Sequence, residues 1–322
     1  MEAAVITTYR CLQKCSMCHI WKYPTVPEEE FPPELLEKLP RLSFCNITGG
    51  EPFLREDLEE IVSRLKKKSR RVVVSTNGYL TERIAALARR HPDLGFRISL
   101  EGLRAVNDEL RGTKGSFDHG LKTLLELKEL GVRDIGFATT VSDRNAADML
   151  SLHRLAEELQ VEFATAAVHN SFYFHKSDNV IQDKDMAASC FRSLASRQLR
   201  SSMIKDWFRA YFNEGLAGYV QGRPRPLPCG AGTQVFFLDP FGEILPCNGM
   251  EEGLWKMSLG NLKELPFREI WESGRAAEVR KKVGACSKNC WMIGTAGPAM
   301  KKHPWKCAFW VCRNKFRYRG TG

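Results

Sequence analysis

Cys11-Leu-Gln-Lys-Cys15-Ser-Met-Cys18 is the stretch of sequence on which the interpretation of this chain depends. Three cysteines separated by three and then two residues can lie in one short loop with converging sulfurs, which suits three irons of a cubane cluster. The fourth iron then has no protein ligand. A structural zinc site normally has four protein ligands, so an open position favours binding of a cofactor or substrate. A zinc loop and buried thiols are the alternatives, and nearby His19 does not complete a familiar zinc-finger spacing.

This spacing resembles the signature of the radical S-adenosylmethionine (radical SAM) superfamily. The resemblance implies that Cys11, Cys15 and Cys18 hold a [4Fe-4S] cluster, and that the open iron binds the amino and carboxylate groups of SAM. It also implies that an electron from the cluster splits the sulfonium and yields a 5′-deoxyadenosyl radical. The residue before the third cysteine is usually aromatic in the family; here it is Met17, whose thioether can also pack on a ring.

The composition fits an intracellular metalloprotein. A chain of 322 residues can bury one large core and a smaller appended unit. It has no signal peptide and no apolar run of about twenty residues, so we expect a cytoplasmic protein. Its eleven cysteines occur in short-range groups, which favours metal ligation in a reducing compartment over disulfides.

The net charge of +10 suggests an anionic partner. No nucleic-acid-binding motif is visible, so we expect no nucleic-acid partner.

Apolar, β-branched runs alternate with helical patterns, which predicts βα units and a parallel sheet. The expected strands are residues 3–9, 42–48, 71–75, 96–100, 134–141 and 162–168. The expected helices are residues 33–39, 55–67, 80–90, 117–130 and 145–159, with further helical sequence from 183 to 219. The predicted fold class is α/β, and the family resemblance implies an open (β/α)6 partial barrel. Functional residues of such a sheet gather at the carboxyl ends of the strands.

Candidate SAM contacts follow the second, third and fourth expected strands. The motif Gly49-Gly50-Glu51-Pro52 allows close backbone approach and offers a carboxylate to an ammonium group. It resembles the family motif that holds the SAM amino group. Each of the next two strand ends could be an ordinary turn. The resemblance nevertheless implies SAM contacts from Ser75, Asn77, Ser99 and Arg111.

Three features near these strand ends need separate comment. Arg111 suits the SAM carboxylate because its guanidinium is a planar, permanently charged fork. Glu101 stands where related enzymes usually have Asp, so its role is open. The polar and aromatic residues 169–178 follow the sixth strand, either as a surface loop or as a substrate contact. His169 lies closest to the strand end and is the candidate catalytic residue.

A second cysteine set lies in the C-terminal third. Cys229, Gly242 and Cys247 match the spacing that opens SPASM and Twitch extensions, and the apolar residues between them predict a hairpin with its turn at 239–242. Cys286 and Cys290 follow an expected helix at 266–283 and can complete the ligand set of an auxiliary [4Fe-4S] cluster. Zinc is the alternative, because four thiolates also satisfy that ion.

The remaining cysteines are not assigned to this cluster. From Cys286 onward, the spacing of the cysteines differs from that of a complete SPASM domain with two clusters. It is closer to the spacing of a Twitch extension with one cluster. Cys307 and Cys312 are therefore expected to be structural or free, although they could ligate a second cluster, while Cys45 and Cys190 are expected to be core thiols.

The Pro-rich segment 223–228 predicts a boundary between a radical SAM domain, residues 1–222, and an auxiliary-cluster domain, residues 223–322. The tail from residue 300 mixes aromatic and basic side chains. It could lie on an anionic membrane surface or over an anionic substrate. A docked helix with a solvated basic face is the interpretation we favour.

The predicted function is that of a radical SAM oxidoreductase that abstracts hydrogen from an unactivated carbon, with the auxiliary cluster accepting the second electron. Peptide-modifying members often have a leader-binding domain ahead of the barrel, whereas here the expected barrel starts at residue 3. This favours a small or lipid-linked substrate, with a ribosomal peptide as the alternative. A non-catalytic iron-sulfur electron carrier is the rival outside the enzyme class. A reductase such as flavodoxin or ferredoxin is the expected electron donor.

Overall fold

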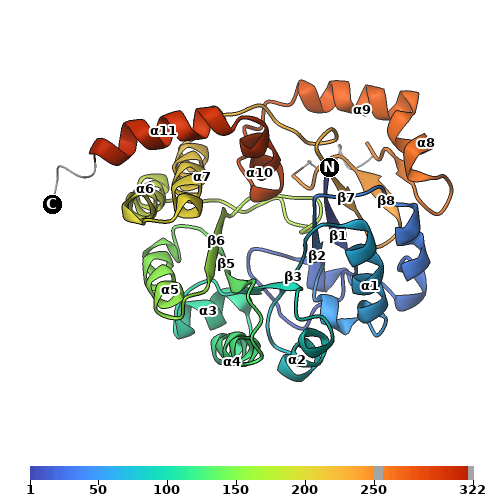
Figure 1. Cartoon of the computed structure of the whole chain (residues 1–322), viewed down its shortest axis with the longest axis horizontal. Coiled ribbons are helices and arrows are strands. Elements are labelled where there is room, and N and C mark those ends of the chain that lie inside the picture. The colour runs from blue at the N-terminus through green and yellow to red at the C-terminus, as the bar shows by residue number, and fades with distance from the viewer. Residues whose placement is uncertain (250–256, 318–322) are drawn as a thin grey trace.

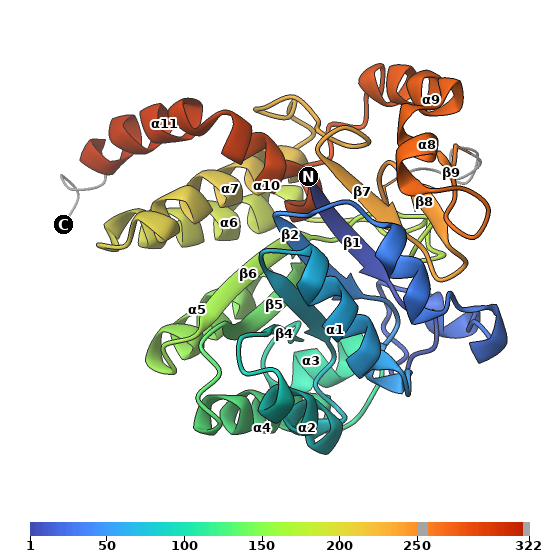
Figure 2. The same ribbon diagram turned by 45° about the vertical axis from the view of Figure 1, so that its right-hand side comes forward.

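Six parallel strands form one curved sheet in the computed structural model, which describes residues 1–249 and 257–317. Hydrogen bonds join the strands in the order β6-β5-β4-β3-β2-β1 (Figures 1 and 2). Their bounds are β1 Glu2–Ile6, β2 Phe44–Thr48, β3 Val72–Thr76, β4 Gly95–Ser99, β5 Ile135–Val141 and β6 Glu162–Ala167. The predicted strands and the α/β partial barrel are therefore confirmed.

Helices cover the outer face of this sheet because that face is continuously apolar. Cys45, Ile47, Val72 and Val74 are all buried there, at alternating positions of two neighbouring strands. The covering helices are α1 Leu58–Lys68, α2 Thr81–Arg90, α4 Ser116–Glu129 and α5 Ala146–Glu158. Short 3-10 helices connect other parts: η1 Ile20–Lys22, η2 Pro27–Glu29, η3 Pro33–Lys38 and η4 Pro52–Leu54.

The C-terminal extension continues the same sheet. Strand β7 Val235–Leu238 pairs in parallel with β1, and β8 Glu243–Leu245 and β9 Gly260–Asn261 follow in antiparallel pairs. At the predicted hairpin turn, the Asp239 carboxylate accepts hydrogen bonds from the backbone N–H groups of Phe241 (2.9 Å) and Glu243 (2.8 Å). The hairpin is confirmed, and the proposed boundary at residue 223 lies upstream of strands that belong to the barrel sheet.

Several expected helices differ from the structure. The helical sequence 183–219 forms two helices, α6 Lys184–Arg200 and α7 Ile204–Val220, because Ser201 leaves the helical conformation and its hydroxyl accepts from the Met203 N–H. The segment 266–283 likewise splits into α8 Phe267–Glu272 and α9 Gly274–Gly284. There, extended Ser273 caps the second helix. The helix expected at residues 33–39 is instead the 3-10 helix η3, which ends at Lys38, and α3 Arg104–Arg111 was not predicted.

Two further helices end the described chain, α10 Ile293–Lys302 and α11 Pro304–Arg317. Figure 1 shows α11 beside α7, whereas α8 and α9 lie at the other side of the molecule, next to β7 and β8. No helix in residues 1–249 and 257–317 has the length and apolarity required to cross a membrane.

Trp291 joins the extension to the barrel helices. Its side chain is fully buried, its ring stacks on Phe212, and its indole N–H donates to the Phe212 carbonyl at 2.9 Å. Gly215 of α7 faces the same indole, and a Cβ at this position would overlap it. A glycine is therefore required where Trp291, the neighbour of Cys290, docks against α7.

We expect Gly215→Ala to destabilise the protein by about 1–3 kcal/mol, because the added methyl group overpacks the Trp291 site. Gly284→Ala is the matched control, since nothing outside its own turn of α9 lies within 4 Å of the position where its Cβ would stand. Thermal unfolding followed by circular dichroism compares the two variants. An unchanged Tm in Gly215→Ala would show that this contact does not limit stability.

Candidate functional site

The loop that carries Cys11, Cys15 and Cys18 is fastened to the last turn of α3. Within it, the Lys14 N–H donates to the Arg111 carbonyl at 3.1 Å, and the Ser16 N–H donates to the Leu110 carbonyl at 2.8 Å. The helix ends at Gly112 in the left-handed conformation (φ 57°), and a Cβ there would lie 2.5 Å from the Lys14 carbonyl oxygen. Only glycine permits this close approach of helix and loop.

The three thiols of this loop form a compact donor set. Burial raises the pKa of Cys11 to about 11 and that of Cys18 to about 12, and it also raises the pKa of Cys15. Cys15 adds to the rise in the pKa of Cys11, and Cys15 and Cys11 add to the rise in the pKa of Cys18. Thiols of this kind remain protonated at neutral pH until iron displaces their protons.

Each thiol of this loop can bind a different iron of a cluster. Within the described ranges, no three His, Cys, Asp or Glu side chains converge as they would around one metal ion. A cubane does not require such convergence, because each cysteine binds a different iron.

The glycines that follow β2 pack against the residues just before the cysteine loop. The Gly50 N–H donates to the Thr8 carbonyl at 2.8 Å. Gly49 has φ 154°, and a Cβ on it would lie 2.6 Å from the Thr8 carbonyl oxygen. A Cβ on Gly50 would overlap the Arg10 carbonyl. These glycines bring the carboxyl end of β2 to the base of the cysteine loop.

Glu51 is fully buried and fixes this turn to the end of β3. Its carboxylate accepts from the Thr76 hydroxyl (2.7 Å), the Asn77 N–H (2.8 Å) and the Phe53 N–H (3.2 Å). Burial raises its pKa, although these three hydrogen bonds favour the charged form. Two predicted SAM contacts, Glu51 and Asn77, thus lie in direct contact. Pro52 is also buried, as the first residue of η4.

Arg111 is placed between the cysteine loop and the end of β4. Its guanidinium donates to the Glu101 carboxylate at 2.8 Å and to the Gln13 side-chain oxygen at 2.5 Å. Gln13 in turn donates to the Ser116 hydroxyl, and Glu101 accepts from the Thr140 N–H. Glu101, whose role the sequence left open, is therefore the ion-pair partner that holds the Arg111 fork. A SAM carboxylate would accept hydrogen bonds from the guanidinium N–H groups of Arg111 that Glu101 and Gln13 do not use.

Some buried polar atoms at this edge have no partner in the described part of the chain. They are Asn77 Nδ2, Arg111 Nε and His169 Nε2. The Ser99 side chain is half-buried, whereas the Ser75 hydroxyl donates to Asn46 of β2 at 3.0 Å. Two unsatisfied donors and one acceptor close to a three-thiol loop fit a polar cofactor such as SAM.

The polar stretch after β6 covers the cysteine loop. Asn179 donates to the Met17 carbonyl at 3.0 Å, the His19 N–H donates to the Phe174 carbonyl at 2.8 Å, and Tyr173 donates to the Gly49 carbonyl at 2.6 Å. This stretch is therefore a structural cover of the site. Sequence reasoning missed Tyr173 and Asn179, because only the fold shows which loop they touch.

His169 lies at the start of this cover. Burial lowers its pKa, so the ring is neutral near pH 7. Its Nδ1 lies 3.2 Å from the Ala167 carbonyl oxygen and must carry the proton to donate there. Its Nε2 is then a buried acceptor without a partner among the described residues.

The four auxiliary cysteines also lie near one another. Burial raises the pKa of Cys247 to about 12, and Cys229, Cys290 and Cys286 add to that shift. Cys290 is tied to the Pro-rich segment by a hydrogen bond of 2.6 Å from Arg225 to its carbonyl. Of the other cysteines, Cys45 and Cys307 are buried, Cys190 is half-buried and Cys312 is exposed.

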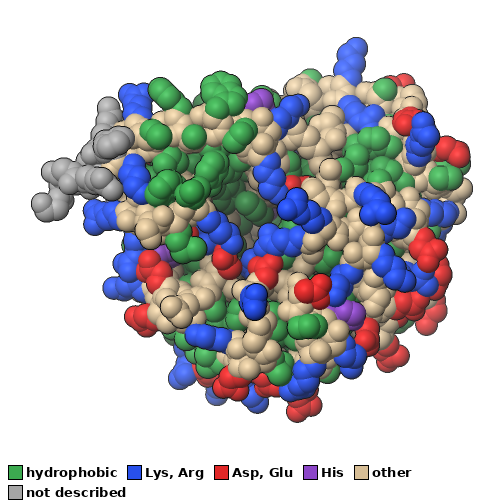
Figure 3. Space-filling model, viewed as in Figure 1, with side chains coloured by type: hydrophobic (Ala, Val, Ile, Leu, Met, Phe, Trp, Pro, Cys, Tyr) green, Lys and Arg blue, Asp and Glu red, His purple; other side chains and the backbone are tan. Residues whose placement is uncertain are grey.

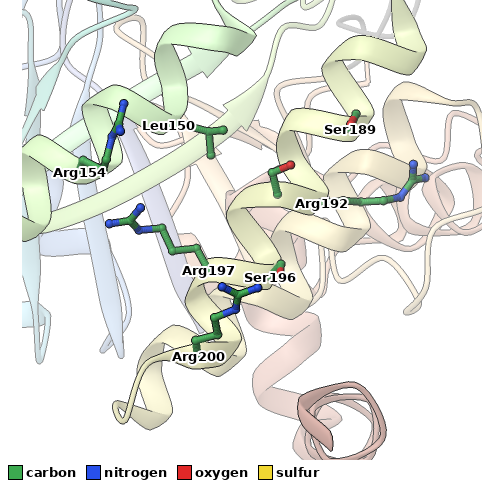
Figure 4. Close-up of a pocket in the computed structure, with 8 residues that line it drawn as sticks. Leu150, Arg154, Ser189, Arg192, Ser196, Arg197 and Arg200 are labelled. Carbon is green, nitrogen blue, oxygen red and sulfur yellow. The ribbon is translucent and has the colours of Figure 1, made fainter. Parts of the chain in front are cut away.

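A cavity of about 600 Å³ lies away from both cysteine sets, on the outer side of α5 and α6 (Figure 4). Arg154, Arg192, Arg197 and Arg200 line it together with serines and Leu150, and no cysteine or predicted SAM contact is among its lining residues. It belongs to the surface of the barrel.

The geometry and two family models agree on the class. Residues 5–156 match the radical SAM superfamily, and residues 229–291 match SPASM, described as an iron-sulfur cluster-binding domain. The chain belongs to the radical SAM superfamily and has a C-terminal SPASM-type extension. Its cofactors are accordingly [4Fe-4S] clusters and SAM.

Among individual proteins, the chain is similar to Fe-coproporphyrin III synthase of Methanosarcina barkeri, with 26% identity over 97% of this chain and 82% of that protein. It is 28% identical to the subtilosin biosynthesis protein AlbA of Bacillus subtilis, over 85% of this chain and 60% of AlbA. In structure it resembles native anSMEcpe with bound AdoMet and the Cp18Cys peptide. That likeness has a TM-score of 0.62 at 17% identity and covers 86% of this chain and 81% of the other.

Two separate ligand sets predict a specific iron content. Anaerobic reconstitution should give about eight irons per chain. Replacing Cys11, Cys15 and Cys18 with Ala should leave about four, as should replacing the four auxiliary cysteines. Iron and zinc analysis checks this, with Cys45→Ala as the control. About four irons plus one zinc in the wild type would contradict an auxiliary cluster.

Proposed function

We propose that this protein is a radical SAM oxidoreductase that removes a hydrogen atom from an unactivated carbon of a small or lipid-linked substrate. The observation that carries the proposal is the joining of the cysteine loop to the predicted SAM contacts. Gln13 of the loop accepts a hydrogen bond from Arg111, and the Gly50 N–H donates to Thr8, between β1 and the loop. An electron carrier needs no such set of polar groups beside its cluster.

When bound, the first cluster and SAM supply the 5′-deoxyadenosyl radical, and the auxiliary cluster supplies an acceptor for the second electron of a net oxidation. The residues of the chain have the roles of binding and orientation. Cys11, Cys15 and Cys18 hold the first cluster, and Cys229, Cys247, Cys286 and Cys290 hold the auxiliary cluster.

SAM is bound by polar groups at the carboxyl edge of the sheet. Gly49, Gly50, Glu51 and Pro52 surround its amino group, while Ser99 and Arg111 contact its carboxylate. Asn77 offers its unpartnered amide, and Ser75 completes the rim of the site. His169 contacts the substrate through its neutral Nε2, which accepts a hydrogen bond and holds the target carbon in place.

The substrate class is supported by the likeness of the chain to Fe-coproporphyrin III synthase, whose name is that of an enzyme of small-molecule metabolism and of which the chain covers 82%. A ribosomal peptide is the second candidate, supported by the likeness to AlbA, a bacteriocin biosynthesis protein. A reductase such as flavodoxin or ferredoxin supplies the electrons.

SAM cleavage tests this function without a known substrate. With dithionite as reductant, the reconstituted wild type should convert SAM into 5′-deoxyadenosine and methionine, because SAM cleavage requires only the first cluster. Cys11→Ala should abolish this, while the double variant Cys286→Ala/Cys290→Ala should retain it. Chromatography quantifies both products. A wild type with full iron content and no 5′-deoxyadenosine would support the electron-carrier alternative.

Arg111→Lys tests the SAM carboxylate contact. Lysine keeps the charge but lacks the planar guanidinium that can donate two parallel hydrogen bonds to a carboxylate, so the Kd for SAM should rise about tenfold. Arg104→Lys is the control on the same helix; its side chain is 71% exposed and pairs with Asp118. Calorimetry gives the affinity, and iron analysis shows that the loop bonded to Arg111 still holds its cluster. An unchanged Kd would remove Arg111 from the SAM site.

A further inference from the structure

Helix α11 has two apolar faces. Cys307 and Val311 are buried on its inner face, which packs on α6 and α7 and confirms the predicted docked helix. On the opposite face, Trp305 is 64% exposed and Phe309 is 69% exposed. They lie one helical turn apart, and exposed Cys312 lies one turn further along the same face. Trp305, Phe309 and Cys312 are called the outer stripe below. In Figure 3, hydrophobic side chains project along the edge that α11 occupies in Figure 1.

Docking of the helix does not require these outer aromatic side chains. The inner face already buries apolar groups against two helices, so the outer stripe is available for another surface. Large exposed aromatic side chains adjacent to one another are unfavourable in water, unless a second surface covers them.

The helical segment that carries this stripe is basic. From Ile293, where α10 begins, to Gly322 the sequence contains no acidic residue but seven Lys or Arg residues. These seven charges are most of the net charge of +10 of the whole chain. Lys302 at the end of α10 is exposed, as are Lys306 and Arg313 of α11, and the Lys306 ammonium lies 5.4 Å from the Trp305 ring centroid.

We propose that the outer face of α11 is a peripheral membrane-binding surface for anionic lipid. Trp305 and Phe309 enter the boundary between headgroups and acyl chains, where aromatic rings are favoured, while the basic side chains contact lipid phosphates. An acidic protein would satisfy the charges, but it offers no general reason for two protruding aromatic rings on a basic helix. The described ranges contain no helix that crosses a bilayer, so the contact is interfacial. This inference does not depend on the proposed reaction.

Cosedimentation of the reconstituted full chain with sucrose-loaded vesicles tests the surface. Binding should be strong with a mixture of phosphatidylcholine and phosphatidylglycerol and weak with phosphatidylcholine alone. The double variant Trp305→Ser/Phe309→Ser should lower the partition coefficient on the mixed vesicles about tenfold. Lys302→Gln/Lys306→Gln should also lower it about tenfold, with little change on neutral vesicles.

Matched controls distinguish binding through this surface from nonspecific binding of the protein to vesicles. Leu125→Ser/Leu265→Ser removes two exposed leucines of α4 and the segment before α8, and Arg89→Gln/Arg90→Gln removes two charges of α2. Both should bind as the wild type does, and circular dichroism should show that all variants are folded. The proposal is overturned if the wild type does not bind mixed vesicles. It is also overturned if the aromatic double variant binds equally well, because binding would then be electrostatic without insertion.

Discussion

The attachment of the cysteine loop to the last turn of α3 is the constraint on which the site depends. Two backbone hydrogen bonds and the close approach at Gly112 set the position of a loop that has no regular structure of its own. Arg111 belongs to the same turn, so one short helix fixes both the loop and the cation next to it. The Glu101 ion pair orients that cation, because Glu101 is itself held by the Thr140 N–H.

The pairing of β7 with β1 extends this constraint to the second cysteine set. Strand β1 leads directly into the first cysteine loop, and the hairpin that begins with β7 leads to Cys247. Trp291 then anchors the segment after Cys290 against α7. The auxiliary cysteines are therefore positioned by the barrel through hydrogen bonds of one sheet and one buried indole. Both cysteine sets are thus carried by neighbouring strands of one sheet.

Buried polar groups show how the site is divided between structure and ligand binding. Glu51 is satisfied by three donors of the chain, and the Arg111 fork is largely satisfied by Glu101 and Gln13. Asn77 Nδ2 and His169 Nε2 have no partner in the part of the chain that the structure describes, so they can pair with a ligand. An unsatisfied buried group costs about 1–3 kcal/mol, so a polar cofactor that pairs with these atoms recovers part of that free energy.

The sequence by itself determined the six βα units, the cysteine spacing, the glycine motif and the hairpin, because these depend on local periodicity and on residues close together in the chain. It did not predict α3 or the breaks at Ser201 and Ser273, where a serine with a non-helical backbone interrupts a helix that the pattern would continue. Only the tertiary structure showed that Glu101 pairs with Arg111, that Tyr173 and Asn179 cover the cysteine loop, and that β7 joins β1. These contacts join residues far apart in sequence, and their partners are selected by the packing of the whole sheet rather than by any local pattern.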